Sequence, residues 1–127
     1  MRLWHESLIS QLPRQQLLGQ HRECAALRGA GWARPHATVD YVFTHPPYKL
    51  FQYHVLIMQE MHRRGYRPDE AWFDPLYRGK TEPPYAEQTP LPADHPIYPE
   101  HDADYLQECL DNLKQKGIVL HMHDIND

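Results

Sequence analysis

Proline is concentrated in one stretch of the chain, because eight of the twelve prolines lie between residues 68 and 99. Each proline removes a backbone amide donor and restricts φ, so neither a long helix nor a central β-strand can run through such a stretch. We therefore predict a long irregular loop here. The stretch also carries Trp72, Tyr77 and Tyr98, whose apolar surface favours docking on the rest of the protein over a disordered linker.

Three segments outside this stretch have the apolar spacing of amphipathic helices. The first follows Pro13 and runs to residue 28, before two glycines end it. The second covers residues 47–65, with a basic last turn and a C-terminal glycine. The third starts at Asp102 or Asp104 and closes by Gly117. The segment 37–44 alternates like a β-strand but has no evident partner, so we expect extended coil there.

Length and composition bound the class of protein. The chain has 127 residues, of which 41% are hydrophobic and 24% charged, so we expect a single domain spanning residues 1–127 with no separate cofactor module. The three helical segments make the expected fold all-α, a compact three-helix domain. No apolar run approaches the roughly 20 residues of a membrane helix. The start has no apolar leader, which points to the cytoplasm. The two cysteines, Cys24 and Cys109, are expected to be reduced core residues.

Charge is unevenly divided along the chain, although its net value is only −4. Residues 1–67 hold nine Lys and Arg against four acids, and eight of those nine bases are arginine. Residues 68–127 hold four bases against thirteen acids. The planar guanidinium suits phosphate, so the N-terminal half is a candidate surface for a polyanion. A solvated surface with arginine chosen for packing explains the same composition.

Five residues of the first predicted helix share one face: Gln15, Gly19, Arg22, Glu23 and Ala26. A glycine within a helix costs about 1 kcal/mol relative to alanine, so Gly19 suggests that another segment or a ligand approaches the helix closely. A carboxylate beside an arginine suits a site that binds an anion and moves a proton. A surface Arg–Glu pair near a helix–helix contact is the plain alternative.

The same helix carries a motif that resembles a known family. Residues 13–23 read PRQQLLGQHRE, which is similar to the first-helix motif Gln-His-Leu-Met-x-x-x-Arg-Glu of the phage-type endonuclease V family, the pyrimidine-dimer DNA glycosylase/lyases. The positions that match are Gln15, Leu17, Arg22 and Glu23, and Gln16 replaces the histidine. The sequence MHRRGY at 61–66 also resembles the end of that family's second helix. The opening MRLWH, with LLGQHREC at 17–24, resembles an uncharacterised bacterial branch.

The resemblance, which covers about half of the chain, implies the three-helix fold and a mechanism that starts from the chain's own α-amine. Such amines ordinarily have a pKa of about 7.7–8, so part of the population is free base at neutral pH. In the family the amine attacks C1′ of the damaged nucleotide, expels the base and forms an imine, after which β-elimination can cut the strand. Glu23 would then stabilise the cationic sugar, and Arg22 would bind phosphate beside the target.

Arg2 marks a departure from the family, which exposes a small threonine amine after its initiator methionine is removed. Arg2 is bulky and should block that removal, so the nucleophile is the α-amine of Met1 or there is none. Without the amine, the protein would be a base-excising hydrolase or a binding protein. The family's aromatic C-terminal tail is also missing, since the chain ends in HMHDIND.

We therefore predict an enzyme, a DNA glycosylase with or without AP-lyase activity, that excises damaged or modified bases from double-stranded DNA as a monomer. Its catalytic residues are predicted to be Met1 and Glu23. Trp32 could stack on a flipped base, although packing explains it equally. The predicted DNA contacts are Arg2, Arg14, Gln15, Arg22, Arg28, Trp32 and Arg34.

Two other classes stay open at this point. One is a non-catalytic nucleic-acid-binding module of the same fold. The other is a metal-dependent hydrolase that uses some of the ten histidines. The candidate ligand groups are His5 with His121, His123 and Asp124, or His54 with His62. Neither has the spacing of a recognised zinc motif, so we expect no metal and no other cofactor.

Overall fold

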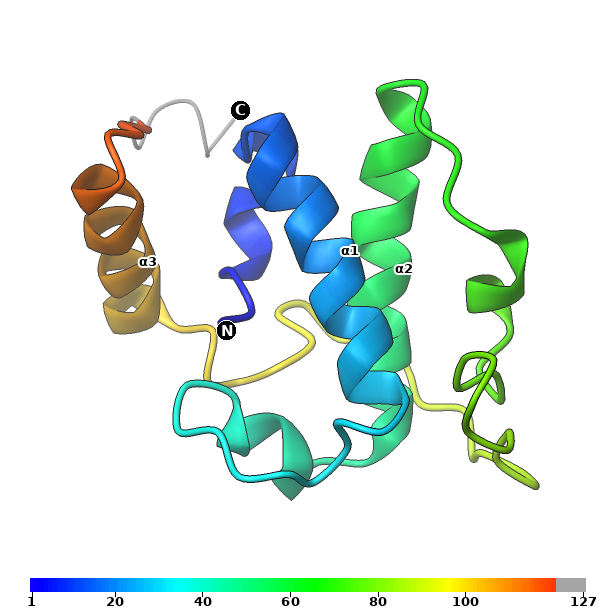
Figure 1. Cartoon of the computed structure of the whole chain (residues 1–127). Helices are drawn as coiled ribbons and strands as arrows, with labels where there is room; N and C mark the ends of the chain where they lie inside the picture. The colour runs from blue at the N-terminus through cyan, green and yellow to red at the C-terminus, as the bar shows by residue number, and fades with distance from the viewer. Residues whose placement is uncertain (121–127) are drawn as a thin grey trace.

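The computed structural model describes residues 1–120, and this range is helical with no β-strand (Figure 1). Its elements are η1 (Glu6–Gln11), α1 (Arg14–Arg28), η2 (Asp40–Thr44), α2 (Pro47–Arg63), η3 (Glu70–Phe73) and α3 (Ala103–Gln115), where η denotes a 3-10 helix. The all-α expectation and the three predicted α-helices are confirmed. No helix within residues 1–120 is both long and apolar enough to span a bilayer.

The helix ends lie where the sequence predicts them. Pro47 occupies the first turn of α2, where its missing amide proton costs no hydrogen bond. Gly65, just beyond α2, has φ of +89°, a conformation that glycine adopts without steric cost. At α3, the side chain of Asp102 accepts a hydrogen bond of 2.9 Å from the Tyr105 backbone N–H. This N-cap satisfies an amide that the helix leaves unpaired.

The core lies where α1 packs against α2, with η1 on α2 as well. α1 buries Leu17, Cys24 and Leu27 on one stripe, and Cys109 of α3 joins the same core. Both cysteines are buried and unpaired, as predicted. The first residues of the chain belong to this core too, since Leu3 is fully buried.

Two short segments differ from the sequence prediction. Residues 40–44 form η2 and not extended coil. Val39 and Val42, three residues apart, are both fully buried, and this i, i+3 spacing matches a 3-10 helix better than the alternation of a strand. Residues 6–11 form η1, which the sequence did not predict.

The proline-rich stretch is irregular apart from η3 and docks on the helices, as predicted. It passes α2 on the side away from the N-terminus and then crosses to α3 (Figure 1). The Trp72 ring lies 5.0 Å from the Arg28 guanidinium, and Tyr98 is fully buried. These aromatic contacts explain why so many prolines do not produce a disordered linker.

Candidate active site

The N-terminal arm, residues 1–5, is tied to α1 through one buried amide. The Gln20 side chain is 1% exposed, and its Oε1 accepts a 2.7 Å hydrogen bond from the Trp4 backbone N–H. Its Nε2 donates to the Arg2 carbonyl at 2.9 Å. On α2, the Tyr53 hydroxyl donates to the Trp4 carbonyl at 2.6 Å. Side chains of two helices therefore determine the path of the arm.

A second set of hydrogen bonds holds the other side of the arm. His101 Nδ1 accepts from the Glu6 backbone N–H at 3.1 Å, so Nε2 carries the ring proton and points to the Tyr41 hydroxyl at 2.6 Å. Tyr41 in turn contacts Tyr105, whose hydroxyl donates to the Leu3 carbonyl. Burial lowers the pKa of His101 to about 3, which keeps the ring neutral.

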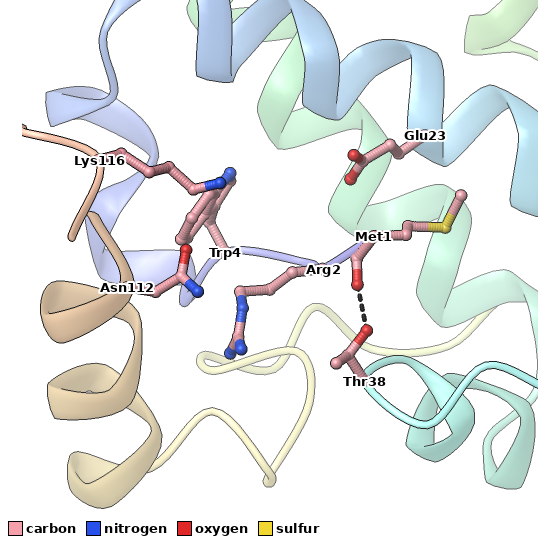
Figure 2. Close-up of a pocket in the computed structure, with 7 residues that line it drawn as sticks. All are labelled: Met1, Arg2, Trp4, Glu23, Thr38, Asn112 and Lys116. Atoms are coloured by element: carbon pink, nitrogen blue, oxygen red, sulfur yellow. Dashed lines mark hydrogen bonds between the residues drawn. The ribbon is translucent and has the colours of Figure 1, made fainter. Parts of the chain in front are cut away.

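The start of the chain and Glu23 line one cavity of about 240 Å³. Figure 2 shows the Glu23 carboxylate pointing from α1 toward Met1, with α3 forming the opposite wall. The residues around the cavity are Met1, Arg2, Trp4, Glu23, Thr38, Asn112 and Lys116. The cavity thus brings together the first residue of the chain, a carboxylate and a lysine.

Glu23 is half-buried and hydrogen-bonded, and no cation within residues 1–120 forms a direct ion pair with it. Its Oε2 accepts from Gln20 Nε2 at 3.0 Å, and its carboxylate also accepts from the Arg2 backbone N–H. Burial raises the pKa of Glu23, and these hydrogen bonds together with the nearby charge of the chain's α-amine oppose that rise. The carboxylate is therefore placed to exchange a proton more readily than an exposed glutamate.

Met1 lines the cavity and is held by two contacts. The Met1 carbonyl accepts a hydrogen bond from the Thr38 hydroxyl, and the Met1 nitrogen lies 3.4 Å from Nε2 of His36. Both contacts come from the loop between α1 and η2. The residue remains 44% exposed, so a substrate has access to the nitrogen.

Three of the predicted DNA contacts gather in a hollow along α1. Arg14, Gln15 and Arg22 are all exposed and line it together with Gln16 and Leu18. The volume of this hollow is about 520 Å³. Since Arg22 precedes Glu23, the hollow and the cavity lie next to each other along the helix.

Arg28 has a structural role, and its prediction as a DNA contact is corrected. The side chain is 4% exposed, and its guanidinium donates to His54 Nδ1 and to the carbonyls of Trp72, Asp74 and Tyr77 at 2.8–3.1 Å. Burial lowers the pKa of Arg28 to about 10. A buried guanidinium that is bonded to carbonyls cannot contact phosphate.

The remaining predicted contacts are spread over different parts of the surface. Arg2 lines the cavity and pairs with Glu108 of α3 at 3.1 Å. Arg34 is exposed and donates to the Ala30 carbonyl at 2.8 Å. Trp32 packs edge-on against Phe43, with 5.0 Å between ring centres.

Gly19 does not mark a close contact within the protein. A methyl group added there would meet only the Arg22 guanidinium, at the ordinary distance of 3.6 Å. The expectation that another segment of the protein approaches the helix closely at Gly19 is therefore wrong, and the N-terminal arm is held by Gln20 and Glu23.

Within residues 1–120, no group of three or more His, Cys, Asp or Glu side chains is arranged to hold a metal ion. His5 stacks on His101, His54 Nε2 lies 2.8 Å from His21 Nδ1, and His62 faces Glu70. Positions 121, 123 and 124 of the other candidate group lie outside the described residues.

Sequence reasoning missed several residues around the site. Gln20 interrupts the apolar stripe of α1, and a polar side chain at a core position was the signal that could have found it. Thr38, Asn112 and Lys116 reach the cavity from a loop and from α3. No local pattern marks them, because only the packing of distant segments brings them to Glu23.

The comparison with protein families yields one match. A family model described as pyrimidine dimer DNA glycosylase matches residues 1–74, which is more than half of the chain and includes Met1, Glu23 and the hollow on α1. No curated protein and no solved structure matches the chain. The family found is the one that the first-helix motif resembles. The chain therefore belongs to the pyrimidine dimer DNA glycosylase family.

Proposed function

We propose that this protein excises damaged pyrimidines from double-stranded DNA, with the α-amine of Met1 as nucleophile and Glu23 as the catalytic carboxylate. Family membership supports the glycosylase activity. The observation that carries the mechanism is the shared cavity, which Met1 and Glu23 both line. Both groups belong to one chain, so a monomer is sufficient.

The chemistry follows from these two groups. The amine's lone pair forms a bond to C1′ as the bond from C1′ to the base breaks, and the base leaves with that electron pair and takes up a proton. The Glu23 carboxylate stabilises the positive charge that develops on the sugar. Opening of the sugar ring gives an imine, and loss of a C2′ proton then expels the 3′ phosphate by β-elimination. This last step is the AP-lyase activity.

DNA binding is assigned to the hollow on α1. Arg14 and Arg22 supply exposed guanidinium groups for phosphates, and Gln15 lies between them. Phosphate contacts of this kind set the position of a protein on the duplex without reading its sequence. Arg22 would hold the backbone next to the nucleotide whose sugar enters the cavity.

Borohydride trapping on a duplex with one abasic site tests the nucleophile. Reduction of the imine should leave a covalent protein–DNA adduct, and intact mass should show that Met1 is retained. A Gly-Ser extension ahead of Met1 moves the amine and should abolish the adduct. Lys116→Ala is the matched control, because it removes the other amine in the cavity and should leave the adduct in place.

Glu23→Gln tests the carboxylate. The variant keeps an acceptor oxygen for Gln20 but lacks the charge, so excision should slow by at least about 100-fold while DNA affinity stays unchanged. Wild-type excision in Glu23→Gln would contradict the assignment. If the wild-type protein binds DNA in a salt-sensitive manner but gives neither excision nor an adduct, it is a non-catalytic nucleic-acid-binding module.

A further inference from the structure

His36 meets the start of the chain from the loop between α1 and η2. Its Nε2 lies 3.4 Å from the Met1 nitrogen, and its Nδ1 lies 3.1 Å from Thr38 Oγ1. The backbone N–H of His36 donates to Asp40 Oδ1 at 2.8 Å, which fixes the loop. Nothing in the proposed mechanism has yet used this imidazole.

The hydrogen bonds determine which ring nitrogen carries the proton. The Met1 ammonium can only donate, so Nε2 of His36 must accept from it. The ring proton therefore lies on Nδ1, from which it is donated to Thr38 Oγ1. The lone pair of Nε2 consequently faces the α-amine.

We propose that His36 is a further catalytic residue, the base that accepts at Nε2 the proton that the Met1 ammonium must lose before it can attack. This inference rests on the proposed function. In the step, one N–H bond of the ammonium breaks, the proton binds Nε2, and the electron pair stays on the amine nitrogen for C1′. The positive charge passes from the amine to the imidazole.

The arrangement has the three parts of an activated nucleophile. The amine is the nucleophile, the imidazole is the base, and Thr38 orients the base through its other nitrogen. Histidine suits the task because an imidazole exchanges its proton near neutral pH.

The other charged groups near the amine have different positions or signs. Arg2 and Lys116 in the cavity are cations and cannot accept a proton at neutral pH. Asp40 is occupied by the backbone N–H of His36. Glu23 faces the amine from α1 across the cavity and is assigned to the sugar. Within residues 1–120, His36 is thus the base that contacts the nitrogen.

Long-range proton–nitrogen NMR of the histidine rings tests the geometry without DNA. The ring signals of His36 are identified by comparing wild type with His36→Gln. The expected tautomer in wild type carries the proton on Nδ1, and Thr38→Val should release the ring to a mixture of tautomers. A proton on Nε2 in the wild type overturns the proposal.

The rate of imine trapping, measured from about pH 5 to pH 8, tests the role. His36→Gln should slow imine formation several-fold at and below neutral pH and should move its onset to higher pH, because the ammonium then loses its proton to water alone. His62→Gln, at an exposed histidine on α2, is the matched control and should behave like wild type.

The outcomes separate the two proposals. A His36→Gln variant with the wild-type rate and pH profile overturns the role of His36 and leaves the amine mechanism intact. A wild type that forms no adduct overturns the amine mechanism, and the role of His36 with it. DNA affinity measured for wild type, His36→Gln and His62→Gln shows whether slower imine formation reflects weaker DNA binding.

Discussion

Glu23 and Gln20 illustrate how two polar side chains of one helix face acquire different roles. Glu23 is half-buried and opens into the cavity, whereas Gln20 is buried and bonded on both ends of its amide. An amide has both a donor and an acceptor, so Gln20 can bond a backbone N–H and a backbone carbonyl together. A carboxylate could not do this, since it only accepts.

Gln20→Leu should lower the free energy of unfolding by about 3 kcal/mol, because it leaves the Trp4 amide and the Arg2 carbonyl buried without partners. Trapping should also slow in the folded variant, since the arm loses its contact with α1. The measurements are urea denaturation and borohydride trapping. Gln15→Leu, an exposed change on the same helix, is the control and should alter stability by less than about 0.5 kcal/mol.

At the scale of elements, a line of buried polar groups joins α1 to α2 and to η3. His21 Nδ1 lies 2.8 Å from His54 Nε2, and Arg28 donates to the other nitrogen of His54. Since an arginine only donates, His54 must accept at Nδ1 and carry its proton on Nε2. Both rings are then neutral, in agreement with the lowered pKa of each, whose first cause is burial.

Arg28→Met should lower the free energy of unfolding by about 3 kcal/mol. The methionine keeps apolar volume but leaves three backbone carbonyls without a donor. Arg34→Met is the matched control, because Arg34 is exposed, and its loss should cost less than about 0.5 kcal/mol. Chemical denaturation at neutral pH measures both, and equal stability of the two variants would contradict the structural role of Arg28.

Acid should destabilise the protein well above the range in which exposed carboxylates titrate. His54 and His101 have a pKa lowered by burial in the folded state, so their stabilising contribution is complete above their ordinary pKa of about 6.5. As pH falls below that value, these histidines bind protons in the unfolded chain but not in the folded protein, so the free energy of unfolding falls. For His101 this loss continues down to a pH of about 3.

Below about pH 6.5 the free energy of unfolding should fall with decreasing pH, with a slope that approaches about 1.4 kcal/mol per pH unit for each of the two histidines. Urea denaturation at a series of pH values measures it. His62→Gln, at an exposed position, should leave the slope unchanged, and His54→Asn should reduce it. A stability that stays constant between pH 7 and pH 5 would show that these rings are not buried in the neutral form.

For the whole molecule, the family match and the cavity have different extents. The match covers residues 1–74, yet the cavity wall is completed by Asn112 of α3 and by Lys116 just beyond it. The proline-rich stretch connects the two parts and brings α3 back to the arm, where Arg2 pairs with Glu108 (Figure 1). The site therefore needs residues of the α3 region in addition to those that the family model matches.

DNA affinity should depend on salt through the hollow on α1. Each phosphate contact contributes about 0.9 to the slope of log affinity against log salt concentration. The double change Arg14→Ala, Arg22→Ala should reduce that slope by about 2. Lys80→Ala, in the proline-rich stretch, should leave it unchanged. Fluorescence anisotropy on a labelled duplex measures the slopes. A double variant with the wild-type slope would show that the hollow on α1 is not part of the DNA-binding surface.

The three α-helices, their ends and the irregular proline-rich stretch could be predicted because each depends on neighbouring residues: apolar spacing, caps and missing amide protons. The first-helix motif likewise predicted the family. The short helices η1 and η2 were not predicted. Such 3-10 turns form where tertiary contacts bury single side chains, and they leave no long periodic pattern in the sequence.

The sequence by itself determined which segments form α-helices, which residues carry charge and which family the chain belongs to. The tertiary structure alone decided which of those charges reach solvent. Arg22 and Arg28 are equal in sequence terms, yet one is exposed and the other is buried against backbone carbonyls. It also placed His36, Thr38 and Lys116 around the start of the chain, because contacts between distant segments depend on how the helices pack, and no local pattern records that packing.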